Sequence, residues 1–160
     1  MVIRKTTLED LPVLMEIYKR ARDFMRETGN ASQWGDHYPE KELIEADIAA
    51  GNSYVCIHEG DIAATFFYSM GPDETYATIY DGDWKKDGPY AVVHRVAVDK
   101  KGAGIVSYCL TWAFEQYPNV RIDTHENNHA MQHALKKNGF SYCGKITLKD
   151  GSERIAFQRV

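Results

Sequence analysis

Cysteine is scarce in this sequence, and its scarcity argues against two kinds of protein. The 160 residues include three cysteines, an odd number, and no two of them have the spacing of a metal-binding pair. We therefore expect neither a disulfide-stapled fold nor a cysteine-ligated metal site. Cys56 and Cys143 lie in strand-like runs and Cys109 in a helical run, which favours burial as small apolar side chains. This usage indicates a reducing compartment, and we expect a cytoplasmic protein.

Long apolar runs, basic excess and low-complexity segments are also missing. No run is long enough to span a bilayer, and the first residues lead directly into a strand and a helix, so we expect no membrane segment and no signal peptide. The net charge of −4, with no basic face evident beyond Lys100–Lys101 and Lys136–Lys137, argues against a nucleic-acid partner. Because 44% of the residues are hydrophobic, residues 1–160 can bury a sizeable core, and we expect one domain.

Hydrophobic periodicity predicts a mixed α/β domain. The segment Gly71–Pro89 has no clear periodicity and is too long for a passive turn, so we expect it to shape a surface or a pocket. The expected helices are Leu8–Arg26, Glu40–Ala50, Gly104–Gln116 and Asn128–Asn138. The expected strands are Val2–Lys5, Ser53–Glu59, Ile62–Met70, Tyr90–Val98, Asn119–Thr124, Phe140–Leu148 and Arg154–Arg159.

The most informative segment is Val92–Leu110, where a β-branched strand enters a basic, glycine-spaced turn that opens an amphipathic helix. Gly102 and Gly104 allow backbone conformations that direct several N–H groups toward one point. The helix N-terminus adds unpaired donors and the positive end of its dipole, and Lys100 and Lys101 add countercharge. This pattern is typical of a pyrophosphate-binding turn, although a strand–glycine–helix turn is also an ordinary connection.

A second segment strengthens the first interpretation. The strand Val120–Thr124 leads into Asn128–Phe140, in which an asparagine precedes an alternating apolar helix and Gly139-Phe140 enters a strand. Together with Lys101-Gly-Ala-Gly104, this arrangement resembles the Gcn5-related N-acetyltransferase (GNAT) superfamily, whose members transfer acyl groups from acyl-coenzyme A to amines. The resemblance extends over nearly the whole chain. It implies an acyl-CoA N-acyltransferase fold, with a central, mostly antiparallel sheet flanked by about four helices.

The resemblance also implies a donor substrate and the residues that bind it. Acetyl-CoA is the expected co-substrate, without a metal, and a homodimer is open by analogy. A backbone N–H near the end of the Tyr90–Val98 strand would polarise the thioester carbonyl. The residues expected to contact acetyl-CoA are Val96, Ala97, Val98, Lys101, Gly102, Ala103, Gly104, Ile105, Val106 and Asn128.

Three positions depart from the family pattern. Lys101 replaces the usual Arg or Gln, which keeps a positive charge but loses a bidentate fork. Val106 replaces a small residue near the expected phosphates. Leu135 stands where many relatives carry a tyrosine that protonates the departing thiolate, so this acid is absent or is supplied from elsewhere.

His94 and Asp123 are the candidates for acid–base chemistry. They lie in the two strands that part to admit the acyl group in the resembled fold, and amine attack requires removal of a proton. Histidine titrates in the useful range, and Asp123 could orient it or a water molecule. The alternative is that His94 is a satisfied core residue and that Arg95 faces the cleft instead.

Three aromatic residues lie outside the predicted helices and strands and are the candidates for binding the acceptor. Trp34, Tyr38 and Trp84 could form a pocket for a small amine through cation–π and stacking contacts, or could plug the ends of a core. Acidic residues surround Trp84 and would favour a cationic acceptor, namely Asp73, Glu74, Asp81 and Asp83.

The leading interpretation is an N-acetyltransferase that moves an acetyl group from acetyl-CoA to a small amine or amino-acid-like acceptor by direct attack in a ternary complex. One alternative is an acyl-CoA-binding module that has lost catalysis, as Val106 and Leu135 suggest. A remote alternative is a zinc hydrolase, because His125-Glu-Asn-Asn-His129 matches the pattern H-E-x-x-H. That chemistry needs both histidines on one helix, whereas His125 directly follows strand residues and the asparagine pair suits a turn.

Overall fold

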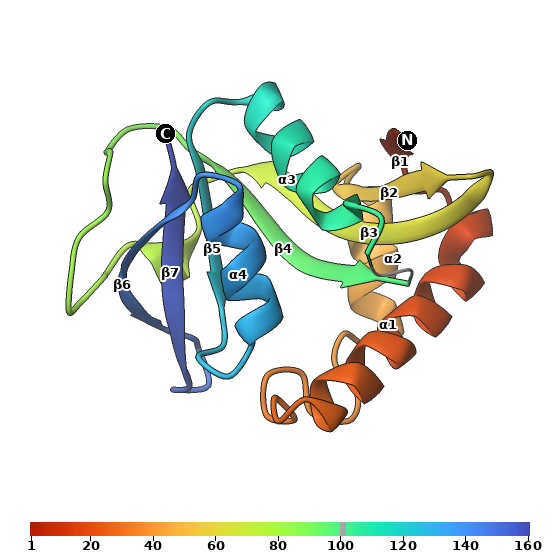
Figure 1. The fold of residues 1–160 in the computed structure, drawn as a ribbon, viewed down its shortest axis with the longest axis horizontal. Coiled ribbons are helices and arrows are strands. Elements are labelled where there is room, and N and C mark those ends of the chain that lie inside the picture. Colours follow the sequence, from red (N-terminus) through yellow and green to blue (C-terminus); the bar gives the residue numbers. More distant parts are fainter. Residues whose placement is uncertain (100–101) are drawn as a thin grey trace. The chain divides into compact units, whose positions relative to one another are not determined.

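The computed structural model describes residues 1–99 and 102–160, and its strands form a seven-stranded sheet in the order β1-β2-β3-β4-β5-β7-β6 (Figure 1). Of the strand pairs in the described residues, β4 and β5 are parallel, whereas β1–β2, β2–β3, β5–β7 and β6–β7 are antiparallel. With four α-helices in the described part of the chain, this architecture confirms the predicted fold class.

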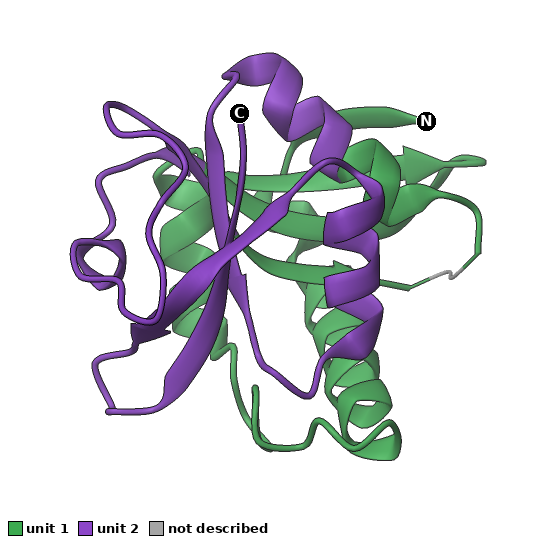
Figure 2. Cartoon of the chain, turned by 60° about the vertical axis from the view of Figure 1, so that its left-hand side comes forward, with its two compact units in different colours: residues 1–68, 94–109 green, residues 69–93, 110–160 purple. Residues whose placement is uncertain are grey.

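The chain divides into two compact units, coloured separately in Figure 2. Unit 1 comprises residues 1–68 and 94–109, and unit 2 comprises residues 69–93 and 110–160. Strands β3 and β4 and helix α3 each contribute residues to both units. The expectation of one domain over residues 1–160 stays a prediction.

Unit 1 contains the N-terminal strands and helices. Its elements are β1 (Val2–Lys5), the 3₁₀ helix η1 (Leu8–Asp10), α1 (Leu11–Glu27), α2 (Lys41–Ala49), β2 (Ser53–His58), most of β3 (Asp61–Met70), most of β4 (Ala91–Val98) and the start of α3 (Ile105–Gln116). The predicted helix Leu8–Arg26 was wrong in its first turn, which is 3₁₀. Pro12 follows at the start of α1, where its missing N–H is tolerated.

A buried apolar cluster holds unit 1 together. Helix α1 contributes side chains that recur at helical spacing, and α2, β2 and β4 contribute one side chain each. The cluster consists of Leu11, Leu14, Ile17, Tyr18, Ile44, Val55 and Ala97. Since it includes residues of α1, α2, β2 and β4, it fixes these four elements relative to one another within the unit.

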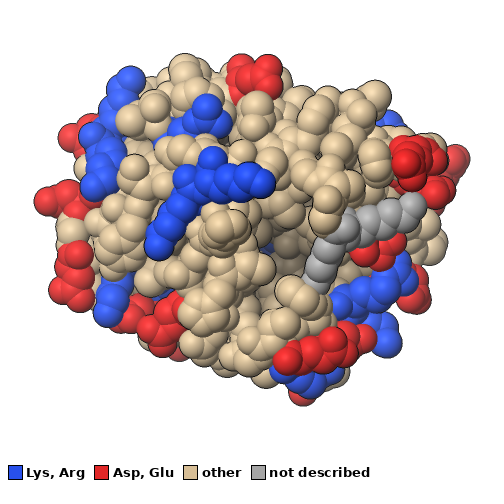
Figure 3. Space-filling view, viewed as in Figure 1, with Lys and Arg blue, Asp and Glu red and all other residues tan. Residues whose placement is uncertain are grey.

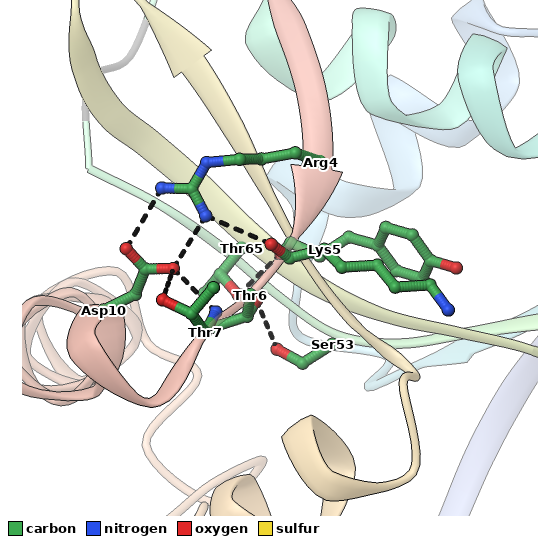
Figure 4. Close-up of polar contacts among 8 residues, drawn as sticks. Arg4, Lys5, Thr6, Thr7, Asp10, Ser53 and Thr65 are labelled. Atoms are coloured by element: carbon green, nitrogen blue, oxygen red, sulfur yellow. Dashed lines mark hydrogen bonds and ion pairs between the residues drawn. The ribbon is translucent and has the colours of Figure 1, made fainter.

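Hydrogen bonds at the start of unit 1 join β1 to the first helical turn (Figure 4). Arg4 donates two bonds to the Asp10 carboxylate, at 2.7 and 3.0 Å, and Asp10 also accepts from the backbone N–H of Thr7 at 2.8 Å. Thr7 and Asp10 therefore form a capping box around the first helical turn. A buried hydroxyl pair, Thr6 and Ser53 at 2.8 Å, ties β1 to β2.

Unit 2 contains the irregular segment and the C-terminal strands. Its elements are η2 (Glu74–Tyr76), β5 (Val120–Thr124), α4 (His129–Lys137), β6 (Ser141–Thr147), β7 (Glu153–Arg159), the first residues of β4 and the rest of α3. The segment between β3 and β4 is fixed by η2 and by backbone bonds between Tyr80 and Lys145. Unit 2 also has buried apolar side chains on β5, α4, β6 and β7, namely Ile122, Leu135, Ile146 and Phe157.

The cysteines, the helices and the surface charge bear on three general expectations from the sequence. Cys56, Cys109 and Cys143 are buried and free, as the sequence predicted. None of the helices in residues 1–99 and 102–160 combines the length and apolarity needed to cross a membrane. On the face shown in Figure 3, basic and acidic side chains are interspersed.

Candidate active site

The glycine-spaced turn of unit 1 has the backbone conformation that the sequence predicted. Gly102 and Gly104 both have left-handed backbones, with φ of 87° and 72°, and a Cβ atom added to either would meet no atom within 4 Å. Helix α3 follows at once, and its first backbone bond runs from the N–H of Tyr108 to the carbonyl of Gly104 at 3.0 Å. The N–H groups of Ile105 and Val106 therefore have no acceptor inside the helix. This geometry suits an anion at the N-terminus of α3.

Charge beside this turn comes partly from a residue that sequence reasoning missed. Lys101, expected to contact acetyl-CoA, and its neighbour Lys100 lie outside the described residues. Arg20 of α1 donates from Nε to the Asp99 carboxylate at 2.6 Å. The guanidinium offsets the one negative charge that directly follows β4, so Asp99 does not repel an anion as an isolated carboxylate would. Nothing in the spacing of Arg20 and Asp99 along the chain signals this pair.

Strand β4 leads into the turn through the predicted donor residues. Ala97 is buried in the core cluster of unit 1, whereas Val96 and Val98 are half-buried. Arg95, directly before them, has a φ of 52°, which is rare for a residue with a long side chain. Such a conformation interrupts the regular alternation of a strand and redirects its N–H groups. The strand therefore has an irregular backbone directly before the residues where a thioester-polarising donor was expected.

His94 lies in the part of β4 that belongs to unit 1. Its ring is half-buried and packs at 5.6 Å from the ring of Phe67 on β3. Asp47 of α2 is a titratable group in this region: burial raises the pKa of its carboxyl, and the charge and hydrogen bond of Arg95 oppose this rise. Asp47 was not a sequence candidate, because a single Asp in a helix gives no sign that it is buried. His94 thus has an aromatic neighbour on β3 and lies within electrostatic range of Asp47.

The aromatic loop before α2 brings together two predicted acceptor-binding residues. Trp34 and Tyr38 meet edge to face with ring centres 6.0 Å apart, and Trp34 meets Tyr18 of α1 in the same way at 5.8 Å. Tyr18 is fully buried, whereas Tyr38 is 38% exposed. The loop is therefore anchored to α1 at Trp34 and offers Tyr38 to solvent.

Asp123 lies in unit 2, on β5, and has a partner that the sequence did not reveal. The hydroxyl of Tyr76 donates to its carboxylate at 2.6 Å. Burial raises the pKa of the Tyr76 hydroxyl well above its ordinary value, and the Asp123 charge raises it further. Tyr76 therefore stays protonated at any physiological pH and holds one carboxylate oxygen in place.

Trp84, the third predicted acceptor-binding residue, is also in unit 2 and has extensive contacts there. Its indole N–H donates to the Tyr76 carbonyl at 3.0 Å, and its ring lies 5.2 Å from the Tyr76 ring. The guanidinium of Arg121 lies 4.2 Å from the indole centre and 4.0 Å from that of Tyr90. One cation over Trp84 is therefore the protein's own, and these contacts account for a structural role. The acceptor-binding role of Trp84 stays a prediction.

The acidic residues near Trp84 have partners within unit 2. Asp73 accepts from the backbone N–H of Thr75 at 2.9 Å and so caps η2. Glu74 lies 3.5 Å from Lys149, and Asp81 lies 3.8 Å from Lys145. These exposed contacts are weak, so they leave much of the negative charge of this segment in place.

Helix α4 begins as the sequence predicted, and its start bears on the zinc pattern. The Asn128 side chain accepts from the N–H of Met131 at 3.1 Å, which confirms the helix cap. His125 precedes the helix, and its Nδ1 accepts from the N–H of Asn127 at 3.0 Å, whereas α4 starts at His129. The two histidines do not share a helix, so the geometry that H-E-x-x-H requires is not formed. Residues 1–99 and 102–160 contain no group of three or more potential metal-ligating side chains.

The two departures in the helices differ in their surroundings. Leu135 of α4 is fully buried, so at this position the chain places an apolar side chain in the interior of unit 2. Val106 is half-buried in the first turn of α3. Because both side chains are apolar, neither position supplies a proton donor.

The fold is that of the acyl-CoA N-acyltransferases. The chain is 35% identical to a GNAT-family acetyltransferase from Streptococcus agalactiae, with a TM-score of 0.92 over 99% of this chain and 94% of that one. The chain therefore belongs to the GNAT family of acetyltransferases. No protein-family model matches the sequence, and a search of curated proteins also finds no match.

More distant solved structures share the fold. A ribosomal-protein-alanine N-acetyltransferase from Brucella melitensis is 20% identical, with a TM-score of 0.69 over 100% of this chain and 99% of that one. The yncA protein of Salmonella typhimurium, solved with acetyl-CoA, is 16% identical, with a TM-score of 0.63 over 98% of this chain and 91% of that one. These two likenesses extend the fold assignment to proteins of very different sequence.

Proposed function

We propose that the chain is an acetyl-CoA-dependent N-acetyltransferase that acts on a small amine or an amino-acid-like acceptor. The observation that carries the proposal is the turn in which Gly102 and Gly104 are both left-handed and lead directly into α3. Converging backbone N–H groups at a helix start bind pyrophosphate, which coenzyme A contains. The acetyl-CoA bound to the yncA protein and the N-acetyltransferase activity named for the Brucella protein support the same donor and the same bond.

Transfer proceeds by direct attack of the amine on the thioester. The nitrogen forms a bond to the carbonyl carbon, the carbon–sulfur bond breaks, and the thiolate leaves. Covalent transfer through a cysteine is disfavoured because Cys56, Cys109 and Cys143 are all buried. Binding donor and acceptor together supplies most of the acceleration by holding the nitrogen in line with the carbonyl.

The residues of β4 serve this step in two ways. A backbone N–H from Val96–Val98 donates to the carbonyl oxygen as negative charge develops there. His94 removes the proton of the attacking amine, directly or through water, and Asp123 is the second residue proposed for acid–base chemistry. The irregular backbone at Arg95 supports the first role, because it frees a strand from uniform pairing.

Trp34, Tyr38 and Trp84 bind the acceptor through their aromatic rings. A cationic amine suits these rings, and the acidic segment that contains Asp81 and Asp83 adds a favourable field. Tyr38 is more exposed than Trp34 in the unit 1 loop, and its accessible ring supports a role in acceptor binding.

A second candidate function is an acyl-CoA-binding module without catalysis. Leu135 favours it, because a fully buried leucine stands where relatives carry a proton-donating tyrosine. The acetyltransferase remains the stronger proposal, since a thiolate with an ordinary pKa can leave without a dedicated acid.

Initial-rate kinetics with both substrates varied test the proposal. A ternary complex predicts intersecting double-reciprocal lines, an amide product by mass spectrometry and no acetylated protein. Parallel lines with an acetylated protein would replace direct attack by a covalent mechanism. Tight binding of acetyl-CoA without turnover on any amine would establish the binding module instead.

A further inference from the structure

Arg95 combines a strained backbone with a side chain whose three nitrogen atoms each contact the protein. Its φ of 52° lies within β4, although no glycine is present to accept that conformation freely. A bulky residue keeps such a conformation only where its surroundings hold it, and such residues concentrate at functional sites. The contacts of the side chain should therefore reveal what holds the strand.

The guanidinium is buried and bound on three sides. Its Nε donates to one carboxylate oxygen of Asp47 at 3.0 Å, and Nη2 forms an ion pair with the same oxygen at 2.9 Å. Its Nη1 donates to the hydroxyl of Tyr38 at 3.1 Å. The guanidinium carbon also lies 4.7 Å from the centre of the Phe67 ring. The side chains of Arg95 and Asp47 are only 12% and 10% exposed. A charge pair this deeply buried is weakly screened by solvent and fixes geometry strongly.

These contacts connect two parts of the proposed site within unit 1. Tyr38 belongs to the aromatic loop and packs against Trp34, which the sequence analysis assigned to the acceptor. Arg95 belongs to β4 and is directly followed by Val96, where the thioester-polarising donors are expected, and directly preceded by His94. Asp47 lies on α2, which the core cluster fixes through Ile44.

We propose that Asp47, Arg95 and Tyr38 form a positioning network that fixes the acceptor-binding loop and the thioester-binding part of β4 to one buried carboxylate. Arg95 is a positioning residue in this network, because its donors are directed at the protein and not at a substrate. The inference rests on the proposed function, and it identifies the geometry of acceptor binding as a property set by Asp47.

The alternative is that the network only stabilises the fold. Buried ion pairs are weak evidence of a stabilising role, and their removal lowers stability whether or not they serve a site. The two possibilities differ in where the effect appears. A positioning network predicts local loosening at the loop and in β4 together with a defect in acceptor use, whereas a structural pair predicts a uniform loss of stability.

Hydrogen exchange and kinetics on matched variants separate these possibilities. Asp47→Asn keeps the size of the side chain and removes its charge, and Tyr38→Phe removes one hydroxyl from a partly exposed ring. Asp10→Asn is the control, because Asp10 is also bound twice by an arginine in unit 1 but lies at the start of α1 (Figure 4).

Asp47→Asn should speed amide exchange in residues 31–38 and 96–98 while β2 keeps its protection. It should lower kcat/KM for the acceptor by about tenfold or more, with acetyl-CoA affinity within about twofold of the native value. Tyr38→Phe should loosen residues 31–38 alone and raise KM for the acceptor. Asp10→Asn should change neither segment.

Native exchange in both segments of Asp47→Asn, or equal loss of protection throughout unit 1, would overturn the network. If Asp47→Asn fails to fold, unchanged loop exchange and unchanged acceptor KM in Tyr38→Phe would overturn it equally. If the native protein turns over no amine, the proposed function fails, and the exchange measurements still decide whether the two segments are coupled.

Discussion

Replacing Gly104 by Asp should weaken acetyl-CoA binding mainly through charge, and Gly104→Asn is the matched control. Both side chains tolerate the left-handed conformation better than most, and a Cβ at this position meets no atom within 4 Å, so neither should clash. The two variants therefore share the same small backbone cost and differ by one negative charge at the turn.

The size of the charge effect follows from the distance to the phosphates. A carboxylate about 6 Å from a phosphate charge, at an effective dielectric constant of about 20, is repelled by about 3 kcal/mol. Because Gly104 is exposed, salt and solvent reduce this to about 1–2 kcal/mol, which corresponds to a roughly 5- to 30-fold increase in Kd. Gly104→Asn should stay within about threefold of the native value.

Isothermal titration calorimetry with acetyl-CoA measures both dissociation constants, and thermal unfolding with and without acetyl-CoA provides a check by mass action. The difference between Asp and Asn should shrink in high salt, as expected for screened charges. Equal affinities for the two variants would place the phosphates elsewhere and refute the assignment of this turn.

Three further predictions concern individual side chains. Leu135→Tyr should lower the free energy of unfolding, measured by urea denaturation, by about 1–3 kcal/mol, because the site is fully buried. Native stability together with a large gain in turnover would show instead that the missing acid limits catalysis. The hydrogen bonds from Arg4 lower the pKa of Asp10 from 3.8 to about 2, so this carboxylate stabilises the fold above pH 4. The free energy of unfolding should fall by about 1 kcal/mol as the pH falls from about 4 to 2. Asp10→Asn should abolish that part of the pH dependence in urea melts; an unchanged profile would contradict it. Trp84→Ala should lower the free energy of unfolding by about 2 kcal/mol through the lost contacts with Arg121. It should also weaken acceptor use several-fold at nearly unchanged acetyl-CoA affinity. If steady-state kinetics of the folded variant give the native kcat and KM for the acceptor, Trp84 does not bind the acceptor.

The fold was predictable because the sequence patterns that specify it are local. The apolar runs of β2 and β5, the helical spacing in α1 and the asparagine before α4 each act within a few residues, and the structure confirms these elements. The exception at Leu8 has the same origin, because the carboxylate of Asp10 closes a 3₁₀ turn that periodicity alone does not distinguish from an α-helical turn.

The contacts around the candidate catalytic residues were less predictable, because they join residues distant in sequence. Arg95 and Asp47 are 48 residues apart, and Tyr76 and Asp123 are 47 apart, so no spacing rule connects them. A positive φ at Arg95 also has no local signal, since arginine does not favour it. Glycine-dependent geometry at Gly102 and Gly104 was predictable for the opposite reason, because glycine marks such conformations.

Release of free thiol from acetyl-CoA, followed across a panel of amines, amino acids and peptides, tests the account most directly. The native protein should release thiol at a rate that depends on the presence and concentration of at least one amine, and Gly104→Asp should show a clear loss at subsaturating acetyl-CoA. Thiol release that is independent of any amine, or none at all despite acetyl-CoA binding, would contradict the assignment of this chain as an N-acetyltransferase.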